Sequence, residues 1–283
     1  MIVITGASGQ LGRLVIQSLL TKVPASRIVA AVRNPQKASD LAALGVQIRR
    51  ADYTDSASLD AAFQGAEKVL LISSSEVGQR LAQHRNAIDA ARRAGVSLLA
   101  YTSLLHADTS PLGLAGEHVA TEAWLAQSGV PFVLLRNGWY TENYLASILP
   151  ALQHGAFIGS AGEGRIASAA RADYAEAAAV VLTTPGQSSK VYELAGDEAY
   201  TLAEFSAELS RQSGKAIPYV DLPENDYKAA LIGAGLPESI AGLLADSDSG
   251  AAKGGLFDET RQLGTLIGRP TTPLAVSMRA ALS

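Results

Sequence analysis

Three glycines near the start of the chain, Gly6, Gly9 and Gly12, have the spacing of a turn that can hold phosphate groups. The apolar run Ile2–Thr5 precedes them, and the amphipathic stretch Gln10–Lys22 follows. Glycine allows a sharp turn off a strand, a close approach of main chain to pyrophosphate, and tight packing of the next helix. The first amides of that helix favour negative charge. The segment therefore predicts a dinucleotide site, although an ordinary strand–turn–helix unit would also fit.

The residue after the second apolar run, Ile28–Val32, indicates which dinucleotide is bound. A site that prefers NAD usually has Asp or Glu here, which accepts a hydrogen bond from the ribose 2′-hydroxyl. This chain has Arg33 instead. A guanidinium suits a 2′-phosphate, because it can bind in a bidentate manner and without charge repulsion. Arg33 therefore favours NADPH, unless it is only a solvated surface arginine.

The elements that must position these residues alternate along the first half of the chain. Strand-like runs are found at Ile2–Thr5, Ile28–Val32, Val46–Arg49, Lys68–Ile72, Leu98–Thr102 and Phe132–Leu135. Helix-like stretches lie between them, at Gln10–Lys22, Pro35–Leu44, Ala57–Phe63, Val77–Ala94 and Gly116–Ser128. This alternation predicts βαβ units and a parallel sheet covered on both faces. We expect an α/β fold of the doubly wound Rossmann type, with its ligand crevice at the carboxyl ends of the strands.

The alternation of strand-like and helix-like segments stops after residue 136, where glycine-rich and aromatic segments follow. The elements expected later are a helix, a strand and a second helix, at Ala172–Leu182, Val191–Leu194 and Thr201–Ser213. Thr201 and Glu204 have the spacing of a capping box at the start of the last of these. We therefore expect a Rossmann domain over 1–137, to which a segment near 166–195 returns. Residues 138–283 would form a smaller, α-rich lobe that covers the substrate.

Composition limits the possible functions. The chain has 283 residues, a net charge of −4 and no cysteine, which excludes disulfides, thiolate nucleophiles and cysteine-bound metals. Lys and Arg are scattered, so neither nucleic acid nor a membrane surface is favoured as a partner. No apolar run reaches the roughly 18–20 residues of a membrane helix, and a strand from Ile2 leaves no room for a targeting peptide. A cytoplasmic protein is expected. The histidines, His84, His106, His118 and His154, are not spaced as metal ligands, so no metal is expected.

The glycine spacing is Gly-x-x-Gly-x-x-Gly, and further short motifs follow in order. They are Arg33-Asn34-Pro35, Ala51-Asp52-Tyr53, Ser73-Ser74-Ser75, Tyr101-Thr102-Ser103, Asn137-Gly138-Trp139-Tyr140-Thr141-Glu142-Asn143-Tyr144 and Arg171-Ala172-Asp173. Over nearly the whole chain, this series resembles the NmrA-like branch of the short-chain dehydrogenase/reductase superfamily. Within that branch, the sequence is most similar to the NADPH-dependent quinone reductases.

The resemblance implies a set of residues that contact NADPH. They are Gly6, Ala7, Ser8, Gly9, Gln10, Leu11, Arg33, Ser73, Ser74, Ser75, Asn137, Gly138, Trp139, Tyr140, Thr141, Glu142, Asn143 and Arg171. It also implies that Asp52 and Tyr53 line the adenine, although Asp52 could equally form a capped turn. The serine run could instead cap the helix expected near Val77. Arg171 could instead be the ion-pair partner of Asp173, an acid in the first turn of a helix.

The usual proton relay of short-chain reductases is missing. That relay is Tyr-x-x-x-Lys, and none of the nine tyrosines has a lysine four residues later. Where related proteins have Tyr-x-x-x-Lys-x-x-x-Glu, this chain has Leu114, His118 and Glu122, while Ser103 remains near the family's serine position. Reducing a ketone creates a basic alkoxide that needs a proton at once, whereas reducing a quinone creates a phenolate stabilised by aromaticity. The pattern therefore favours hydride transfer to a quinone, or to a similar flat conjugated acceptor, by proximity and orientation.

The aromatic segment after the sixth strand contains the candidates for contact with an acceptor. Trp139, Tyr140 and Tyr144 could stack on a flat ring, and the amides of Asn137 and Asn143 could hydrogen-bond nicotinamide or a quinone oxygen. The same residues could equally pack a core or form a turn. No catalytic group is assigned, and the candidates are Asn143, Tyr140 and His106. The expected partner is a small quinone-like molecule, with a homodimer as an option. The alternative function is a non-catalytic NADP(H) redox sensor.

Overall fold

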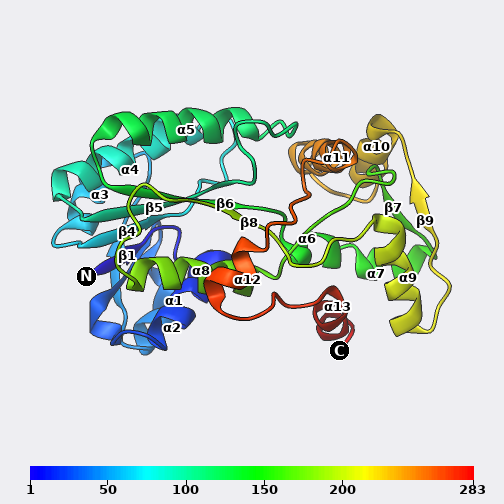
Figure 1. The fold of residues 1–283 in the computed structure, drawn as a ribbon, viewed down its shortest axis with the longest axis horizontal. Coiled ribbons are helices and arrows are strands. Elements are labelled where there is room, and N and C mark those ends of the chain that lie inside the picture. The colour runs from blue at the N-terminus through cyan, green and yellow to red at the C-terminus, as the bar shows by residue number, and fades with distance from the viewer. The chain divides into compact units, whose positions relative to one another are not determined.

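The chain forms two compact units in the computed structural model, which describes residues 1–283. The first unit contains residues 1–107, 116–137 and 171–192, and the second contains 108–115, 138–170 and 193–283 (Figure 1). The short segment 108–115 thus clusters with the second unit although it lies between two elements of the first. No helix in the molecule combines the length and the apolar character needed to cross a bilayer.

A seven-stranded sheet has the order β3-β2-β1-β4-β5-β6-β8. The strands are β1 (Ile2–Ile4), β2 (Ile28–Val32), β3 (Gln47–Arg50), β4 (Lys68–Leu71), β5 (Leu98–Leu104), β6 (Phe132–Asn137) and β8 (Val191–Leu194). The pairs from β3 through β6 are all parallel. The chain winds outward from β1 to β3 and then returns to β4 on the other side of β1, which creates a topological switch point. The expected doubly wound Rossmann fold is confirmed.

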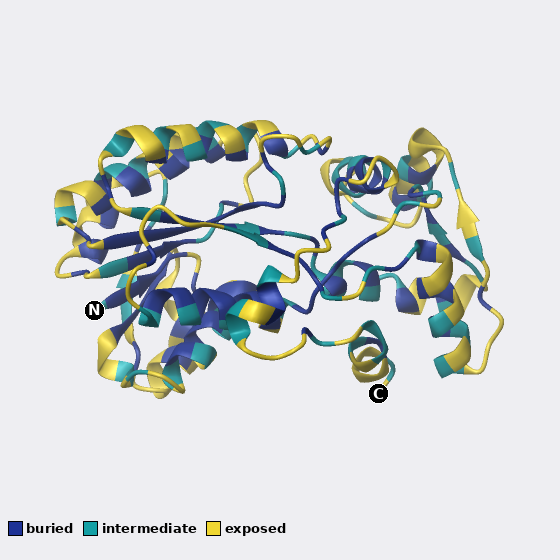
Figure 2. Cartoon of the chain, viewed as in Figure 1, coloured by how far each residue is buried: buried dark blue, intermediate teal, exposed yellow.

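Helices cover both faces of this sheet (Figure 1). They are α1 (Gln10–Leu20), α2 (Ser39–Ala43), α3 (Ser56–Phe63), α4 (Arg80–Ala94), α5 (Ala115–Ser128) and α8 (Arg171–Thr183), with short 3-10 turns at Ala25–Arg27 and Pro35–Ala38. On one face Phe63, Ile88 and Leu125 from α3, α4 and α5 pack against strand residues such as Val3 and Leu99. The helices α1 and α8 pack together on the other face. Figure 2 shows the central strands buried, which leaves their carboxyl ends to carry function.

The second unit is mostly helical, with one two-stranded sheet. Its elements are α6 (Thr141–Leu145), α7 (Ile148–His154), β7 (Phe157–Gly159), α9 (Leu202–Ser213), β9 (Tyr219–Asp221), α10 (Glu224–Gly233), α11 (Glu238–Ala252), α12 (Gln262–Ile267) and α13 (Leu274–Leu282). The strands β7 and β9 pair in parallel, and Phe157 stacks on Phe205 with 4.8 Å between ring centroids. The expected capping box is confirmed, since Thr201 accepts from the Glu204 amide and Glu204 accepts from the Thr201 amide.

Candidate functional site

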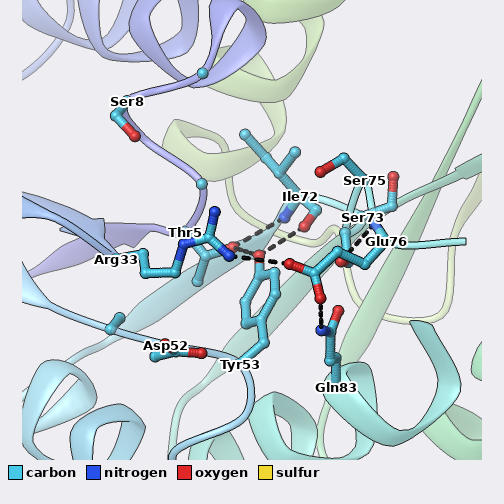
Figure 3. Close-up of a pocket in the computed structure, with 14 residues that line it drawn as sticks. Thr5, Ser8, Arg33, Asp52, Tyr53, Ile72, Ser73, Ser75, Glu76 and Gln83 are labelled. Atoms are coloured by element: carbon cyan, nitrogen blue, oxygen red, sulfur yellow. Dashed lines mark hydrogen bonds and ion pairs between the residues drawn. The ribbon is translucent and has the colours of Figure 1, made fainter. Parts of the chain in front are cut away.

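A pocket of about 290 Å³ lies at the carboxyl ends of β1 to β4, within the first unit (Figure 3). The predicted cofactor residues that line it are Gly6, Ser8, Gly9, Arg33, Ser73, Ser74 and Ser75. The pocket adjoins β1 and β4, on either side of the switch point, where open α/β sheets bind their ligands. Glu76 and Gln83 also line the pocket, and the sequence motifs did not indicate them.

The glycine turn leaves the start of α1 open to an anion. Gly6 is left-handed, with φ +57°, and the Gly9 amide donates to its carbonyl at 2.9 Å. A Cβ at Gly12 would lie 2.6 Å from the Gly6 carbonyl oxygen, so only glycine allows this packing. Gly9 precedes α1 without a side-chain cap, and the first turn of α1 has no acidic residue. Its unpaired amides and positive dipole end are therefore available to a phosphate.

The other predicted residues of this turn differ in exposure. Leu11 is buried, so its main-chain amide is what it can offer a ligand, whereas the buried Ala7 donates its amide to the Ala31 carbonyl at 3.4 Å. Gln10, the first residue of α1, has an exposed side chain. The turn thus offers mainly backbone, which suits pyrophosphate better than a ligand that needs side-chain recognition.

Arg33 is paired across the pocket rather than free in solvent. Its Nη1 donates to Oε1 of Glu76 at 2.9 Å, and the two side chains are 72% and 46% exposed. The second carboxylate oxygen of Glu76 accepts from Nε2 of Gln83 at 2.7 Å. Figure 3 shows this chain of contacts, from Arg33 through Glu76 to Gln83. The guanidinium predicted to bind a 2′-phosphate therefore already faces a carboxylate of the protein.

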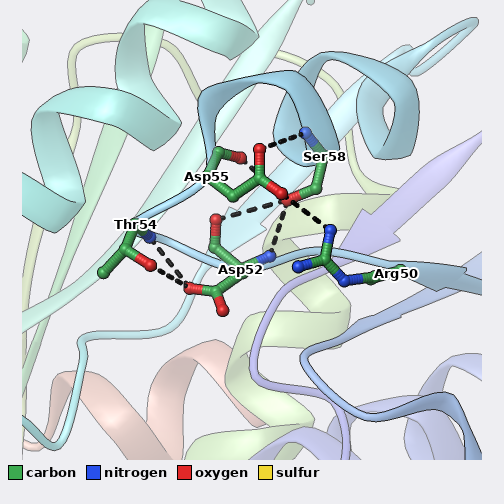
Figure 4. A network of polar contacts seen from close by, with 5 residues as sticks. All are labelled: Arg50, Asp52, Thr54, Asp55 and Ser58. Carbon is green, nitrogen blue, oxygen red and sulfur yellow. Dashed lines mark hydrogen bonds and ion pairs between the residues drawn. The ribbon is translucent and has the colours of Figure 1, made fainter.

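Asp52 forms the turn that one interpretation expected, and it also lines the pocket, while its contact with adenine stays a prediction. Its Oδ1 accepts from the amide and the hydroxyl of Thr54, at 2.9 and 2.7 Å (Figure 4). These two bonds lower the pKa of Asp52, with a smaller contribution from Arg33 and Arg50. The amide of Asp52 donates to Oγ of Ser58 at 2.9 Å, which fixes the turn against α3.

Tyr53 is anchored under the pocket by its hydroxyl. The hydroxyl oxygen lies 2.6 Å from both Oγ1 of Thr5 and the carbonyl oxygen of Ile72. Burial raises the pKa of Tyr53, so the phenol stays neutral. The ring thereby connects the ends of β1, β3 and β4, which are the strands that bound the pocket.

The serine run is held by main-chain contacts on its buried side. The amide of Ser73 donates to Oγ1 of Thr102 at 2.8 Å. The amide of Ser74 donates to Nε2 of His84 at 2.9 Å, and Nε of Arg80 donates to the Ser74 carbonyl at 2.7 Å. The hydroxyl of Ser74 accepts from the Glu76 amide at 3.1 Å, which places Glu76 at the pocket.

The serines do not cap α4, so that alternative is wrong. The helix begins at Arg80 rather than near Val77, because Gly78 is left-handed with φ +88°. Oε1 of Glu117, from α5, accepts from the amides of Gly78 and Arg80 at 3.0 and 3.2 Å. A glutamate distant in sequence thus caps the helix and leaves the serine hydroxyls to other uses.

A buried polar cluster joins α4, β5 and α5, next to the serine run. The His84 ring accepts from Ser74 through Nε2, so its proton is on Nδ1, 3.0 Å from Oγ1 of Thr121. Nδ1 of His118 lies 2.8 Å from the Tyr101 hydroxyl. Burial, helped by the charge of Arg80, lowers the pKa of both histidines to about 3. His118, at the family's lysine position, is therefore a neutral core residue and not a cation.

Ser103, at the family's serine position, is also engaged within the protein. Its hydroxyl donates to Oε1 of Glu122 at 2.5 Å. Arg136 donates to both oxygens of Glu122, at 3.0 and 2.7 Å, and both charged side chains are 11% exposed. The residues at these relay positions thus tie α5 to β5 and β6.

The segment after β6 is divided between the two units. Asn137 is buried in the first unit, and its Oδ1 has no hydrogen-bond partner. Gly138 to Asn143 belong to the second unit, where the hydroxyl of Thr141 lies 2.9 Å from that of Ser168. A buried amide oxygen without a partner is uncommon, and a ligand with an N–H group would satisfy it.

Tyr144 is a core residue of the second unit, which favours the packing interpretation of this aromatic residue over stacking on a ligand. It is 5% exposed, and its hydroxyl donates to Oδ1 of Asp248 at 2.9 Å. Burial and the nearby carboxylate raise its pKa. Its ring lies 6.3 Å from that of Trp139, which is 8% exposed. The periodicity of aromatic residues could not separate packing from ligand contact.

The remaining candidates lie at the ends of elements. Tyr140 immediately precedes α6, and Asn143 and Glu142 are within it. Arg171 is the first residue of α8, and Asp173 lies buried in the first turn of that helix. His106 follows β5 in a left-handed conformation, with φ +48°, which is uncommon for a residue with a Cβ. The roles of these residues stay predictions.

The chain is similar to known dinucleotide-dependent proteins along its length. Residues 6–185 match the family described as NAD(P)H-binding. The chain is 64% identical over 278 residues to quinone oxidoreductase 2 of Escherichia coli, covering 98% of this chain and 97% of that protein. The crystal structure of the E. coli NADPH-dependent quinone oxidoreductase complexed with NADPH superposes with a TM-score of 0.98, at 62% identity and 100% coverage of both chains.

A second solved structure has a different acceptor in its name. The Citrobacter sp. triphenylmethane reductase complexed with NADP(H) has a TM-score of 0.95 and 39% identity, covering 99% of this chain and 100% of that one. The chain therefore belongs to the NAD(P)H-binding family. The resemblance found from the motifs is confirmed.

Proposed function

We propose that this chain is an NADPH-dependent oxidoreductase that transfers hydride to a quinone. The observation that carries the proposal is the 64% identity, over nearly the whole chain, to a quinone oxidoreductase. The pocket at the switch point, with an uncapped helix start and Arg33 at its rim, supports the binding of NADPH. The absence of a tyrosine–lysine pair supports a quinone as the hydride acceptor.

The residues of the first unit fit NADPH. The amides at the start of α1 would hold the pyrophosphate, and Arg33 would hold the 2′-phosphate. The turn of Asp52 and Tyr53 would line the adenine, and the serine run would meet the nicotinamide ribose. The unsatisfied Oδ1 of Asn137 would accept a hydrogen bond from the carboxamide N–H of the nicotinamide.

When bound, NADPH supplies the hydride, and the protein has to place the acceptor beside it. His118 and Ser103 are committed to internal contacts, so neither is our proton donor. A quinone tolerates this arrangement, because its reduced form is a stabilised phenolate that can take a proton from water. Catalysis would then rest on proximity and orientation, with Trp139, Tyr140 and Asn143 as the proposed contacts. A cytoplasmic location and a homodimer stay predictions from the sequence.

Steady-state oxidation of NADPH in the presence of benzoquinones and naphthoquinones tests the proposal. We expect turnover with at least one quinone and a clear preference for NADPH over NADH. Binding of NADPH without turnover on any quinone would contradict it and would favour the redox-sensor alternative.

A further inference from the structure

In the pocket, the acidic side chain of Glu76 pairs with Arg33, the cation expected to favour NADPH over NADH. Glu76 lies in the loop after β4, and its Oε1 is 2.9 Å from Nη1 of Arg33. Its Oε2 accepts from Gln83 at 2.7 Å, and its amide donates to Ser74 at 3.1 Å. Each oxygen of the carboxylate therefore has its own partner, Arg33 after β2 and Gln83 in α4.

We propose that Glu76 determines how strongly this pocket prefers NADPH over NADH, by competing with the 2′-phosphate for Arg33. The inference rests on the proposed NADPH site. A 2′-phosphate that pairs with Arg33 must displace the carboxylate or lie beside it, and like charges at this range repel each other. A ribose 2′-hydroxyl carries no charge and can donate a hydrogen bond to a carboxylate. Glu76 thus opposes the phosphate that Arg33 attracts.

Two neighbouring residues, Asp52 and Gln83, affect this competition between Glu76 and the 2′-phosphate. Asp52 lies near enough to Arg33 for the charge of that arginine to contribute to lowering the pKa of the Asp52 carboxyl, so a second carboxylate acts on Arg33. Gln83 is 4% exposed, and its Oε1 has no partner while its Nε2 holds Glu76. Gln83 would keep a glutamine at position 76 in place as well, because the amide oxygen of that glutamine can accept the same hydrogen bond.

The test is the substitution Glu76→Gln, with dissociation constants for NADPH and NADH measured by calorimetry at fixed low ionic strength. In water, two like charges about 4 Å apart, such as a carboxylate and a 2′-phosphate, repel each other by about 1 kcal/mol. Removing one of them therefore strengthens binding by roughly fivefold. We expect NADPH to bind about fivefold more tightly, while NADH binds equally or more weakly. The ratio of the two constants should therefore shift toward NADPH.

Glu67→Gln is the matched control. Glu67 also pairs with an arginine, Arg27, at 2.8 Å, and the two side chains are 52% and 54% exposed. This change removes the same charge from the same unit but away from the pocket, so it should leave the ratio unchanged. The Arg33→Ala background adds a second check, because the gain from Glu76→Gln should be smaller once the contested cation is absent.

The outcomes separate this inference from the proposed function. A ratio that is unchanged in Glu76→Gln, or that falls because NADPH binds more weakly, would overturn the role of Glu76. Failure of the unaltered protein to bind NADPH at all would overturn the proposed cofactor site itself. Binding of 2′,5′-ADP (adenosine 2′,5′-bisphosphate) and of 5′-AMP should repeat the shift, because these two fragments differ only in the 2′-phosphate.

Discussion

The loop from Ser73 to Glu76 has two sides that differ in their exposure to water. On the pocket side, Glu76 pairs with Arg33, and the two side chains are 46% and 72% exposed. On the other side, Ser74 contacts Arg80 and His84, which are 8% and 0% exposed. Water weakens the first set of contacts and cannot replace the second. We infer that the buried contacts hold the loop in place, while the exposed pair of Glu76 and Arg33 influences which dinucleotide binds beside the loop.

Removal of the buried arginine should give the largest effect on stability at neutral pH. Arg80 donates to the Ser74 carbonyl at 2.7 Å, and its Nη1 lies 3.3 Å from Nε2 of His118. Arg80→Met removes both contacts, so we expect the free energy of unfolding to fall by about 3 kcal/mol. Urea denaturation measures this change. The control is Arg33→Met, on the exposed side, which should change stability by less than about 0.5 kcal/mol. Equal losses in the two variants would remove the distinction between the two sides.

The buried histidines should make stability depend on pH. Their pKa of about 3 in the folded chain is below the unfolded value of about 6.5. The unfolded chain therefore binds more protons between these values. This contribution is complete above about pH 6.5 and is lost as the pH falls toward 3. Each of His84 and His118 should lower the free energy of unfolding by about 1.4 kcal/mol per pH unit within that range.

Urea denaturation across this range, with the double variant His84→Gln and His118→Gln for comparison, checks the slope. The variant should lose much of the pH dependence that the unaltered chain shows. Asp248 in the second unit acts in the opposite sense, because burial raises its pKa to about 6 and its contribution is lost as the pH rises. The difference between the two proteins cancels this effect. Identical slopes would mean that the histidines are not buried as neutral rings.

Loss of the exposed arginine should affect binding rather than folding. With Arg33→Ala we expect the dissociation constant of NADPH to rise about tenfold, since a charge-assisted pair with phosphate is lost. NADH should bind as before. Calorimetric titration with both dinucleotides measures this, and an equal loss for NADH would show that Arg33 does not recognise the 2′-phosphate.

The smallest effect is expected at the family's serine position. Ser103 donates to the Glu122 carboxylate and not to a reacting atom, so Ser103→Ala should change kcat with a quinone by less than about threefold. Steady-state kinetics measures kcat, and thermal unfolding serves as the control for folding. A loss of a hundredfold or more would restore Ser103 to a proton relay and contradict the structure-based assignment.

The sequence predicted those features that depend on neighbours along the chain. The strand Ile28–Val32, the capping box at Thr201 and the glycine turn at Gly6 each follow from local geometry. The order of alternating elements was enough to predict a doubly wound sheet, because parallel strands need crossover connections.

Features that depend on distant residues could not be predicted. The cap of α4 comes from Glu117, and the partner of Arg33 is Glu76, on different elements. The hydroxyl of the buried Tyr144 donates to Asp248, which is 104 residues away. The strands β7 and β9 have three residues each, too few for a periodic signal.

A stoichiometric reduction without oxygen tests the central claim most directly. The protein is mixed with a limiting amount of NADPH and an excess of quinone, and both products are quantified after the cofactor is consumed. The account predicts one hydroquinone formed for each NADPH oxidised, with no semiquinone released. NADPH that stays bound and unoxidised beside every quinone tested would contradict it.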